Sequence, residues 1–134
     1  MTAPESRNVD WMTDTIKVML CTDVFTPLQD THDFKNLVTN EVVGGTYVAG
    51  GATLGGKTIT YTGGTNVLKL DADDTQWPAS TITARWAIIY DDAPALDADK
   101  PLLGYVDFGA NFSSSNGLFE IRWNVAGMFT ITVA

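Results

Sequence analysis

The stretch STITARWAIIY, residues 80–90, decides the fold class. Apolar and polar side chains alternate along it, which is typical of a β-strand with one buried face. We expect one inward row, made of Ile82, Ala84, Trp86 and Ile88. The opposite row turns apolar at Ala87 and Ile89, so the second half of the strand is expected to be covered on both faces.

The same alternation recurs outward from this strand. Period-two patterns occupy residues 14–22, 57–62, 66–70 and 102–108, and Gly63–Gly64 suits the tight turn of a hairpin. About eight short strands separated by glycine-rich or aspartate-rich turns predict an all-β domain, a β-sandwich or distorted barrel. The expected exception is one short helix in THDFKNLV, residues 31–38, where Phe34, Leu37 and Val38 share a helical face.

The C-terminal residues predict a second hairpin. LFEIRWN, residues 118–124, turns at VAG and returns as MFTITVA, residues 128–134. The inward side chains would be Phe119, Ile121, Trp123, Phe129, Ile131 and Val133. A last strand this apolar is expected to lie inside a sheet or to be covered by a neighbouring chain.

Size and charge restrict the class of protein. We expect an N-terminal arm at residues 1–12 and a single β-sandwich domain at 13–134, because 134 residues with 45% apolar content supply one core. The net charge of -8 and the scattered lysines and arginines oppose direct binding to nucleic acid or to an anionic membrane. Neither a secretory signal nor an apolar run of about 18 residues is present, which predicts synthesis in a cytoplasm.

Several residues raise the question of a metal site or a reactive group. Asp71, Asp73 and Asp74 are candidate ligands of a calcium ion between strands, although Gln76 and Ile82 occupy positions where an EF-hand needs Gly and Glu. We favour a solvated turn there and expect no cofactor. For the single cysteine, Cys21, a buried apolar role is favoured over a reactive thiol.

Two further motifs resemble a phosphate-binding loop and a metal or catalytic cluster, and neither is assigned that function. The stretch LGGKTIT, residues 54–60, is not assigned as a phosphate-binding loop, because it leads into a strand where such loops lead into a helix. The stretch QDTHDF, residues 29–34, holds the only histidine between carboxylates. We interpret Asp30 as the N-cap of the short helix and Asp33 as a first-turn acid, with His32 pointing outward. The chain is therefore expected not to be an enzyme.

Four tryptophans divide into two pairs. Trp86 and Trp123 fall on inward strand faces and are expected in the core. Trp11 and Trp77 lie near strand ends, where they would either pack as lids or contact a partner. A carbohydrate-binding β-sandwich that stacks sugars on Trp11 or Trp77 is an alternative from a different class.

An ordered set of segments resembles a family of small virion proteins of tailed bacteriophages. It comprises Trp11 with DTIKVML, THDF, GGATLGGKTITY, DADD with Trp77, TITARWAIIYDD and PLLGYVDFG, covering most of the chain from residue 11 onward. The N-terminal MTAPESRNVD departs from the longer glycine-bearing segment found in such proteins.

The resemblance implies a non-enzymatic structural protein of the virion, with a capsid decoration (cement) protein as the leading hypothesis. It would bind the major capsid protein on the capsid surface as a trimer or other symmetric homo-oligomer, after folding in the host bacterial cytoplasm. The N-terminal segment through Trp11 and the loops around Tyr47, Trp77 and Leu96 are the expected contacts. A tail or fibre-associated component is the alternative.

Overall fold

The computed structural model describes residues 9–133, so residues 1–8 of the predicted N-terminal arm lie outside the described part. The strands are β1 (Ile16–Cys21), β2 (Ala52–Thr53), β3 (Thr58–Thr62), β4 (Val67–Asp71), β5 (Thr75–Ser80), β6 (Thr83–Asp91), β7 (Leu102–Ser113), β8 (Gly117–Ile121) and β9 (Phe129–Thr132). Two single 3-10 turns, η1 (Lys35–Leu37) and η2 (Asp97–Asp99), are the helical elements there. None of the helices in residues 9–133 is long and apolar enough to cross a membrane.

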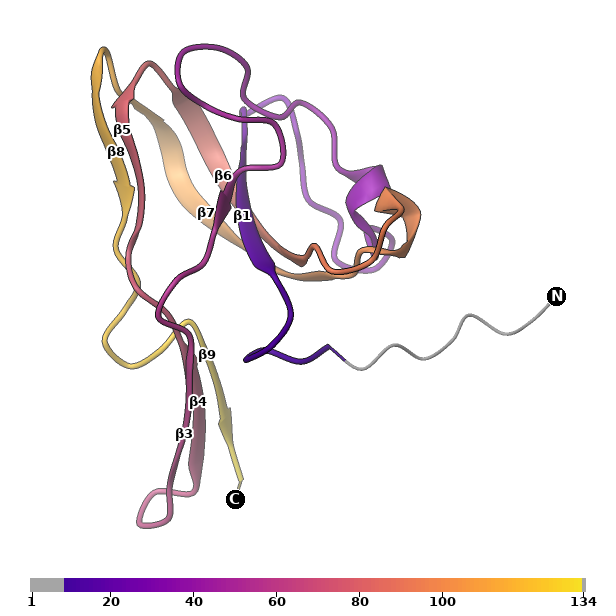
Figure 1. Cartoon of the computed structure of the whole chain (residues 1–134), viewed down its shortest axis with the longest axis vertical. Helices are drawn as coiled ribbons and strands as arrows, with labels where there is room; N and C mark the ends of the chain where they lie inside the picture. The colour runs from indigo at the N-terminus through magenta and orange to yellow at the C-terminus, as the bar shows by residue number, and fades with distance from the viewer. Residues whose placement is uncertain (1–8, 134) are drawn as a thin grey trace, which may run out of the picture.

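The strands form three antiparallel sheets, which confirms the predicted all-β, sandwich-like class. One sheet has the order β2-β1-β6-β7, the second pairs β5 with β8, and the third has the order β3-β4-β9. The first two sheets make the body of the molecule, whereas β3, β4 and β9 extend away from it (Figure 1). We call this third sheet the projecting sheet.

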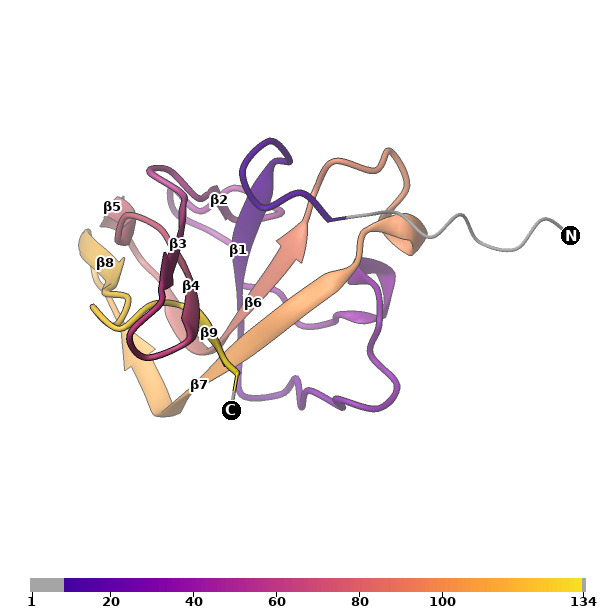
Figure 2. The same cartoon turned by 90° about the horizontal axis from the view of Figure 1, so that it is seen from below.

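Apolar side chains cover both faces of the four-stranded sheet. On one face, β1 and β6 pack with β5 and β8 in a cluster that includes Val18, Leu20, Ala87, Ile89, Trp77 and Phe119. On the other face a smaller cluster comprises Met19, Cys21, Phe25, Ile88 and Tyr90. Viewed from below, β5 and β8 lie on one side of the β1–β6–β7 layer and the irregular segments around η1 on the other (Figure 2).

Strand β6 confirms the expected strand and its double-sided cover, but not the single inward row. Between Ala84 and Trp86 the pairing with β7 shifts register, because the partner residue moves from Phe112 to Asp107. Ala84 and Ala87 therefore share the first cluster, while Trp86 and Ile88 belong to the second. The alternation along β6 changes phase at this irregularity, so a strict period-two pattern assigns Trp86 and Ile88 to the wrong face.

The predicted C-terminal hairpin is wrong, because β8 and β9 belong to different sheets. Strand β8 pairs with β5, where Phe119 packs edge-on against Trp77 at 6.0 Å between ring centroids. Strand β9 pairs with β4 and is the last strand of its sheet. The turn between them, in which the N–H of Gly127 donates to Asn124 at 2.8 Å, redirects the chain toward the projecting sheet.

The short helix predicted in residues 31–38 is present only as the single 3-10 turn η1. Phe34 lies at its N-cap position with no side-chain cap, so Asp30 and Asp33 do not cap a helix. The backbone here pairs with the segment that enters β7, because Asp33 O accepts from the N–H of Leu102 at 2.9 Å. Strand-like pairing thus overrides a three-residue helical pattern, which is a weak signal.

A chain of ion pairs ties η1, η2 and β1 together. Asp92 contacts Lys17 at 2.9 Å and Lys100 at 2.8 Å, and Asp97 contacts Lys35 at 2.8 Å and Lys100 at 3.1 Å. Burial raises the pKa of Asp92, but hydrogen bonds from Lys100 and Lys17 outweigh it, so the net pKa is lowered. Hydrogen bonds from Lys35 and Lys100 likewise lower the pKa of Asp97.

Candidate functional site

The three candidate calcium ligands serve three separate local roles. Asp71 accepts a hydrogen bond from the next backbone amide at 3.0 Å, and Asp74 accepts one from the N–H of Trp123 at 2.9 Å. The carboxylate of Asp73 lies against the backbone of Gly56. Within residues 9–133, no group of three or more His, Cys, Asp or Glu side chains is placed to hold a metal ion.

The glycine-rich segment before β3 carries the linear spacing of a phosphate-binding loop. Four residues separate Gly51 from Gly56, and Lys57 and a threonine follow. The segment nevertheless leads into β3, and Asp73 lies directly against Gly56, where a second anion would be repelled. The ammonium group of Lys57 donates to the backbone carbonyl of Asp14. The spacing of the segment matches a phosphate-binding loop, but the strand that follows it and the carboxylate of Asp73 beside it do not.

His32 has a structural role different from the expected one. Its Nδ1 accepts a hydrogen bond from the N–H of Leu28 at 3.0 Å, and its ring stacks on Phe25 with centroids 5.4 Å apart. The imidazole therefore closes a turn and packs against the smaller apolar cluster. It also lines a hollow of about 530 Å³ together with Ile88 and Tyr105.

Three of the four expected contact residues are core residues. Trp11, Tyr47 and Trp77 are 4%, 8% and 5% exposed, so their side chains offer little surface to a partner or a sugar. Trp11 also donates from its indole N–H to Thr58 O at 3.1 Å, which fixes its ring inside the fold. Only Leu96 of this set is exposed, at 65%.

A network of buried hydrogen bonds fixes residues 41–51, which we call the 41–51 loop. The hydroxyl of Tyr47 accepts from the N–H of Leu20 at 2.9 Å and donates to Glu41 at 2.8 Å. The same oxygen of Glu41 accepts from the N–H of Gly50 at 2.6 Å, and Tyr90 donates to the carbonyl of Gly50 at 2.6 Å. Burial raises the pKa of the Tyr47 hydroxyl, so the group stays a neutral donor and acceptor.

Further contacts hold the loop against β1 and β5. The N–H of Val42 donates to Leu20 O at 2.9 Å, and the hydroxyl of Thr46 donates to Pro78 O at 3.1 Å. On this anchored backbone, the side chains of Val43 and Val48 are 91% and 70% exposed. The sequence predicted the loop around Tyr47 as a contact, but the exposed apolar surface of this loop is that of Val43 and Val48 and not of Tyr47 itself.

A groove of about 680 Å³ opens between β7 and the chain that follows β8. Its lining includes the aromatic rings of Tyr105, Phe108, Phe112 and Trp123. Tyr105 and Phe112 are 44% and 55% exposed, which leaves apolar surface open to solvent along β7. Sequence reasoning missed this groove because Trp123 lies in the segment after β8, and β8 pairs with β5 and not with β7, which supplies the other three rings.

No protein-family model, curated protein or solved structure matches the chain.

Proposed function

We propose that this chain is a structural protein of a bacteriophage virion, a capsid decoration protein that binds the outer surface of the major-capsid lattice and stabilises the head. The resemblance of its ordered segments to small phage virion proteins supplies the function class. The observation that supports attachment to a protein surface is the 41–51 loop, an anchored backbone with bare valine side chains.

The physical argument rests on the order of this loop before binding. A flexible loop loses conformational freedom when it docks, at about 0.5–1.5 kcal/mol for each immobilised side chain. Hydrogen bonds from Tyr47 and Tyr90 already fix the backbone that carries Val43 and Val48. Burial of exposed valines against a partner then contributes about 25 cal/mol per Å² of apolar surface.

A contact of this size is small for a single interface, and repetition makes it effective. Identical copies arranged with the symmetry of a lattice, or linked as a trimer or other symmetric oligomer, add their contacts through high effective concentration. The net charge of -8 would then select a lattice surface that is not itself strongly acidic.

The test compares two exposed valines on different loops. Val43→Asp places a charge on the 41–51 loop, and Val125→Asp does the same on the loop before β9, where the wild-type side chain is 90% exposed. Each variant competes with isotope-labelled wild-type protein for the virion, and mass spectrometry of purified particles gives the incorporation ratio. Both folds are checked by thermal unfolding.

We expect Val43→Asp to lower incorporation by about tenfold or more, because a carboxylate would be buried at the contact. Val125→Asp is expected to stay within about twofold of wild type, as a surface charge outside the contact. Equal incorporation of both variants would remove the 41–51 loop as the contact. Incorporation of only a few copies per particle would favour the tail or fibre alternative over decoration.

A further inference from the structure

The projecting sheet is amphipathic across its two faces. The registers of β3, β4 and β9 place Ile59, Leu70 and Phe129 in one cross-strand row and Tyr61, Leu68 and Ile131 in the next. All six side chains are apolar or aromatic and share one face, which we call the apolar face. The opposite face carries mainly threonines, together with Lys69, Asp71 and the single apolar residue Val67.

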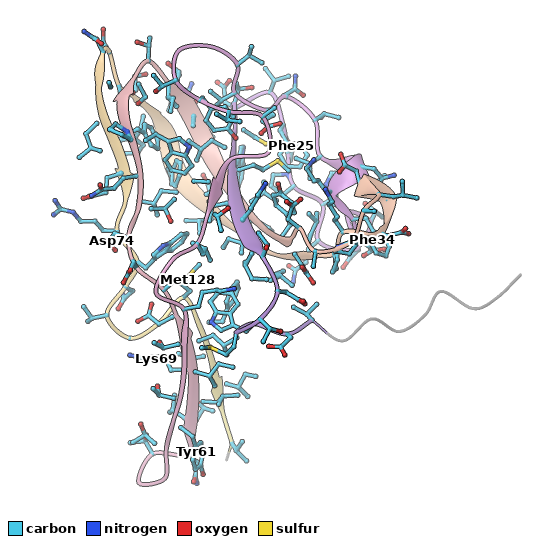
Figure 3. The ribbon with its side chains drawn as sticks, viewed as in Figure 1. Phe25, Phe34, Tyr61, Lys69, Asp74 and Met128 are labelled. Carbon is cyan, nitrogen blue, oxygen red and sulfur yellow. The ribbon has the colours of Figure 1, made fainter. Side chains whose placement is uncertain are left out.

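In the inner row, Leu70 and Phe129 pack against the core cluster of the body, whereas Ile59 is 45% exposed. The ring of Phe129 packs edge-on against Trp11 at 6.0 Å and lies against Gly104 of β7. In the outer row, Tyr61 is 63% and Ile131 is 55% exposed. Figure 3 shows Tyr61 far from the body, near the tip of the sheet. A sheet with one apolar and one polar face is typical of a layer that packs against another layer.

The charge distribution indicates which partner suits this face. Residues 57–71 hold two lysines and one aspartate, a net charge of +1, so the rest of the chain carries -9. Lys69 and Asp71 lie on the opposite face, and Lys57, which precedes β3, donates to the backbone carbonyl of Asp14. Two copies of the chain repel each other through most of their surface, and the projecting sheet is where like-charge repulsion between them is smallest. An ionic partner would find no charge on this face to pair with.

The dimensions of the apolar face predict a weak contact. Three strands of four or five residues, about 4.8 Å apart, give a flat footprint on the order of 250 Å² at most. A stable dimer buries about 800 Å² on each partner. Contact through this face alone is therefore expected to produce a concentration-dependent equilibrium and not a permanent dimer.

We propose that the apolar face is a self-association surface, on which a second copy of the chain packs its own projecting sheet face to face about a two-fold axis. A two-fold axis presents the same patch on both copies, so the outer rows around Tyr61 and Ile131 cover one another. The two sheets would pack about 10 Å apart, as in a β-sandwich. This inference does not rest on the virion role.

The experiment uses neighbouring residues with opposite side-chain directions as matched pairs. Tyr61→Lys and Ile131→Lys place a charge on the apolar face, whereas Thr62→Lys and Thr132→Lys place it on the opposite face of the same strands. Sedimentation velocity of the full chain, from low micromolar to high micromolar concentration, gives the dimerisation constant of each protein. Circular dichroism and thermal unfolding establish that each variant is folded.

We expect the sedimentation coefficient of the wild type to rise with concentration. The apolar-face variants are expected to weaken dimerisation by about tenfold or more, since each dimer would bury two lysines at its centre. The opposite-face variants are expected to stay within about twofold of wild type. Monomeric wild type at every concentration, or equal effects on both faces, overturns the proposal. Loss of particle attachment in Tyr61→Lys with a monomeric wild type assigns the face to another protein and also overturns it.

A cross-linking measurement covers the case in which a lysine variant fails to fold. Cys21 is the only cysteine in the sequence and is fully buried, so a bis-maleimide reagent reaches an introduced thiol selectively. Tyr61→Cys is expected to give covalent dimers in a concentration-dependent yield, and Thr62→Cys far fewer. Equal yields from the two positions contradict face-to-face packing.

Discussion

The hydroxyl of Tyr47 is the atom on which the order of the 41–51 loop depends most directly. It accepts from the N–H of Leu20 at 2.9 Å and donates to Glu41 at 2.8 Å, inside a region where Leu20 is fully buried. Tyr47→Phe removes one oxygen and keeps the ring, which stacks on Trp77 with centroids 6.2 Å apart. The substitution therefore isolates the hydrogen bonds from the packing.

The expected loss of unfolding free energy follows from the two groups that lose a hydrogen-bond partner, the N–H of Leu20 and the carboxylate of Glu41. The N–H of Leu20 becomes an unsatisfied buried donor, which costs about 1–3 kcal/mol. Glu41 keeps its bond from the N–H of Gly50 but loses the hydroxyl, at about another 1 kcal/mol. The free energy of unfolding should fall by about 2–4 kcal/mol. For a domain of this size that lowers Tm by about 6–15 °C.

Urea unfolding and calorimetry measure the loss, and amide hydrogen exchange locates it. The Leu20 and Gly50 amides should exchange faster in Tyr47→Phe, while amides of the projecting sheet keep their wild-type rates. Tyr61→Phe is the control, because Tyr61 is 63% exposed and its hydroxyl donates to Asn66 on the surface. That control is expected to cost less than about 0.5 kcal/mol. Equal stability losses in the two variants would refute the buried network as the anchor of the loop.

Three further predictions concern other parts of the molecule. A Cβ at Gly51 would lie 1.9 Å from a backbone oxygen of β1, so Gly51→Ala should destabilise by more than about 3 kcal/mol in urea unfolding, whereas Gly64→Ala, with open space around it, should change little. The lowered pKa of Asp92 means that its ionised form stabilises the fold above the pKa of the unfolded chain. This stability is lost as pH falls through the folded-state pKa. Plots of Tm against pH should therefore drop less steeply on the acid side for Asp92→Asn than for wild type. Burial, with a contribution from Glu41, raises the pKa of Cys21 to about 12. The thiol should react with Ellman's reagent only on unfolding, and reaction in the native state at neutral pH would contradict its burial.

The strands were predictable where local pattern and burial agree. The stretch 80–90 contains most of β6 (Thr83–Asp91) with the expected cover on both faces, and the patterns at 57–62 and 66–70 fall on the β3–β4 hairpin. Predictions failed where long-range pairing decides. The faces of β6 change phase at the register shift after Ala84, and β8 pairs with β5 and not with β9. Neither the partner of a strand nor the position of a register shift is encoded in its own period-two pattern.

The candidate site was predictable only in part for a related reason. Trp11 and Trp77 were predicted to contact a partner because they are aromatic residues near strand ends. Both are buried in the core instead. Tyr47 is buried as well, and its hydroxyl holds the 41–51 loop by hydrogen bonds to Leu20 and Glu41. The exposure of Val43 has no signal in the sequence. Its neighbour Val42 is the same residue type but is buried, because the backbone points the two side chains in different directions.

The location of the chain in purified phage particles tests the central claim most directly. Quantitative mass spectrometry of particles gives its copy number, and cryo-electron microscopy of the same particles gives its position. If the chain is a capsid decoration protein, we expect hundreds of copies, on the order of the number of capsid subunits, as density on the outer face of the head with the 41–51 loop turned toward the lattice. Absence of the chain from the head density would contradict it.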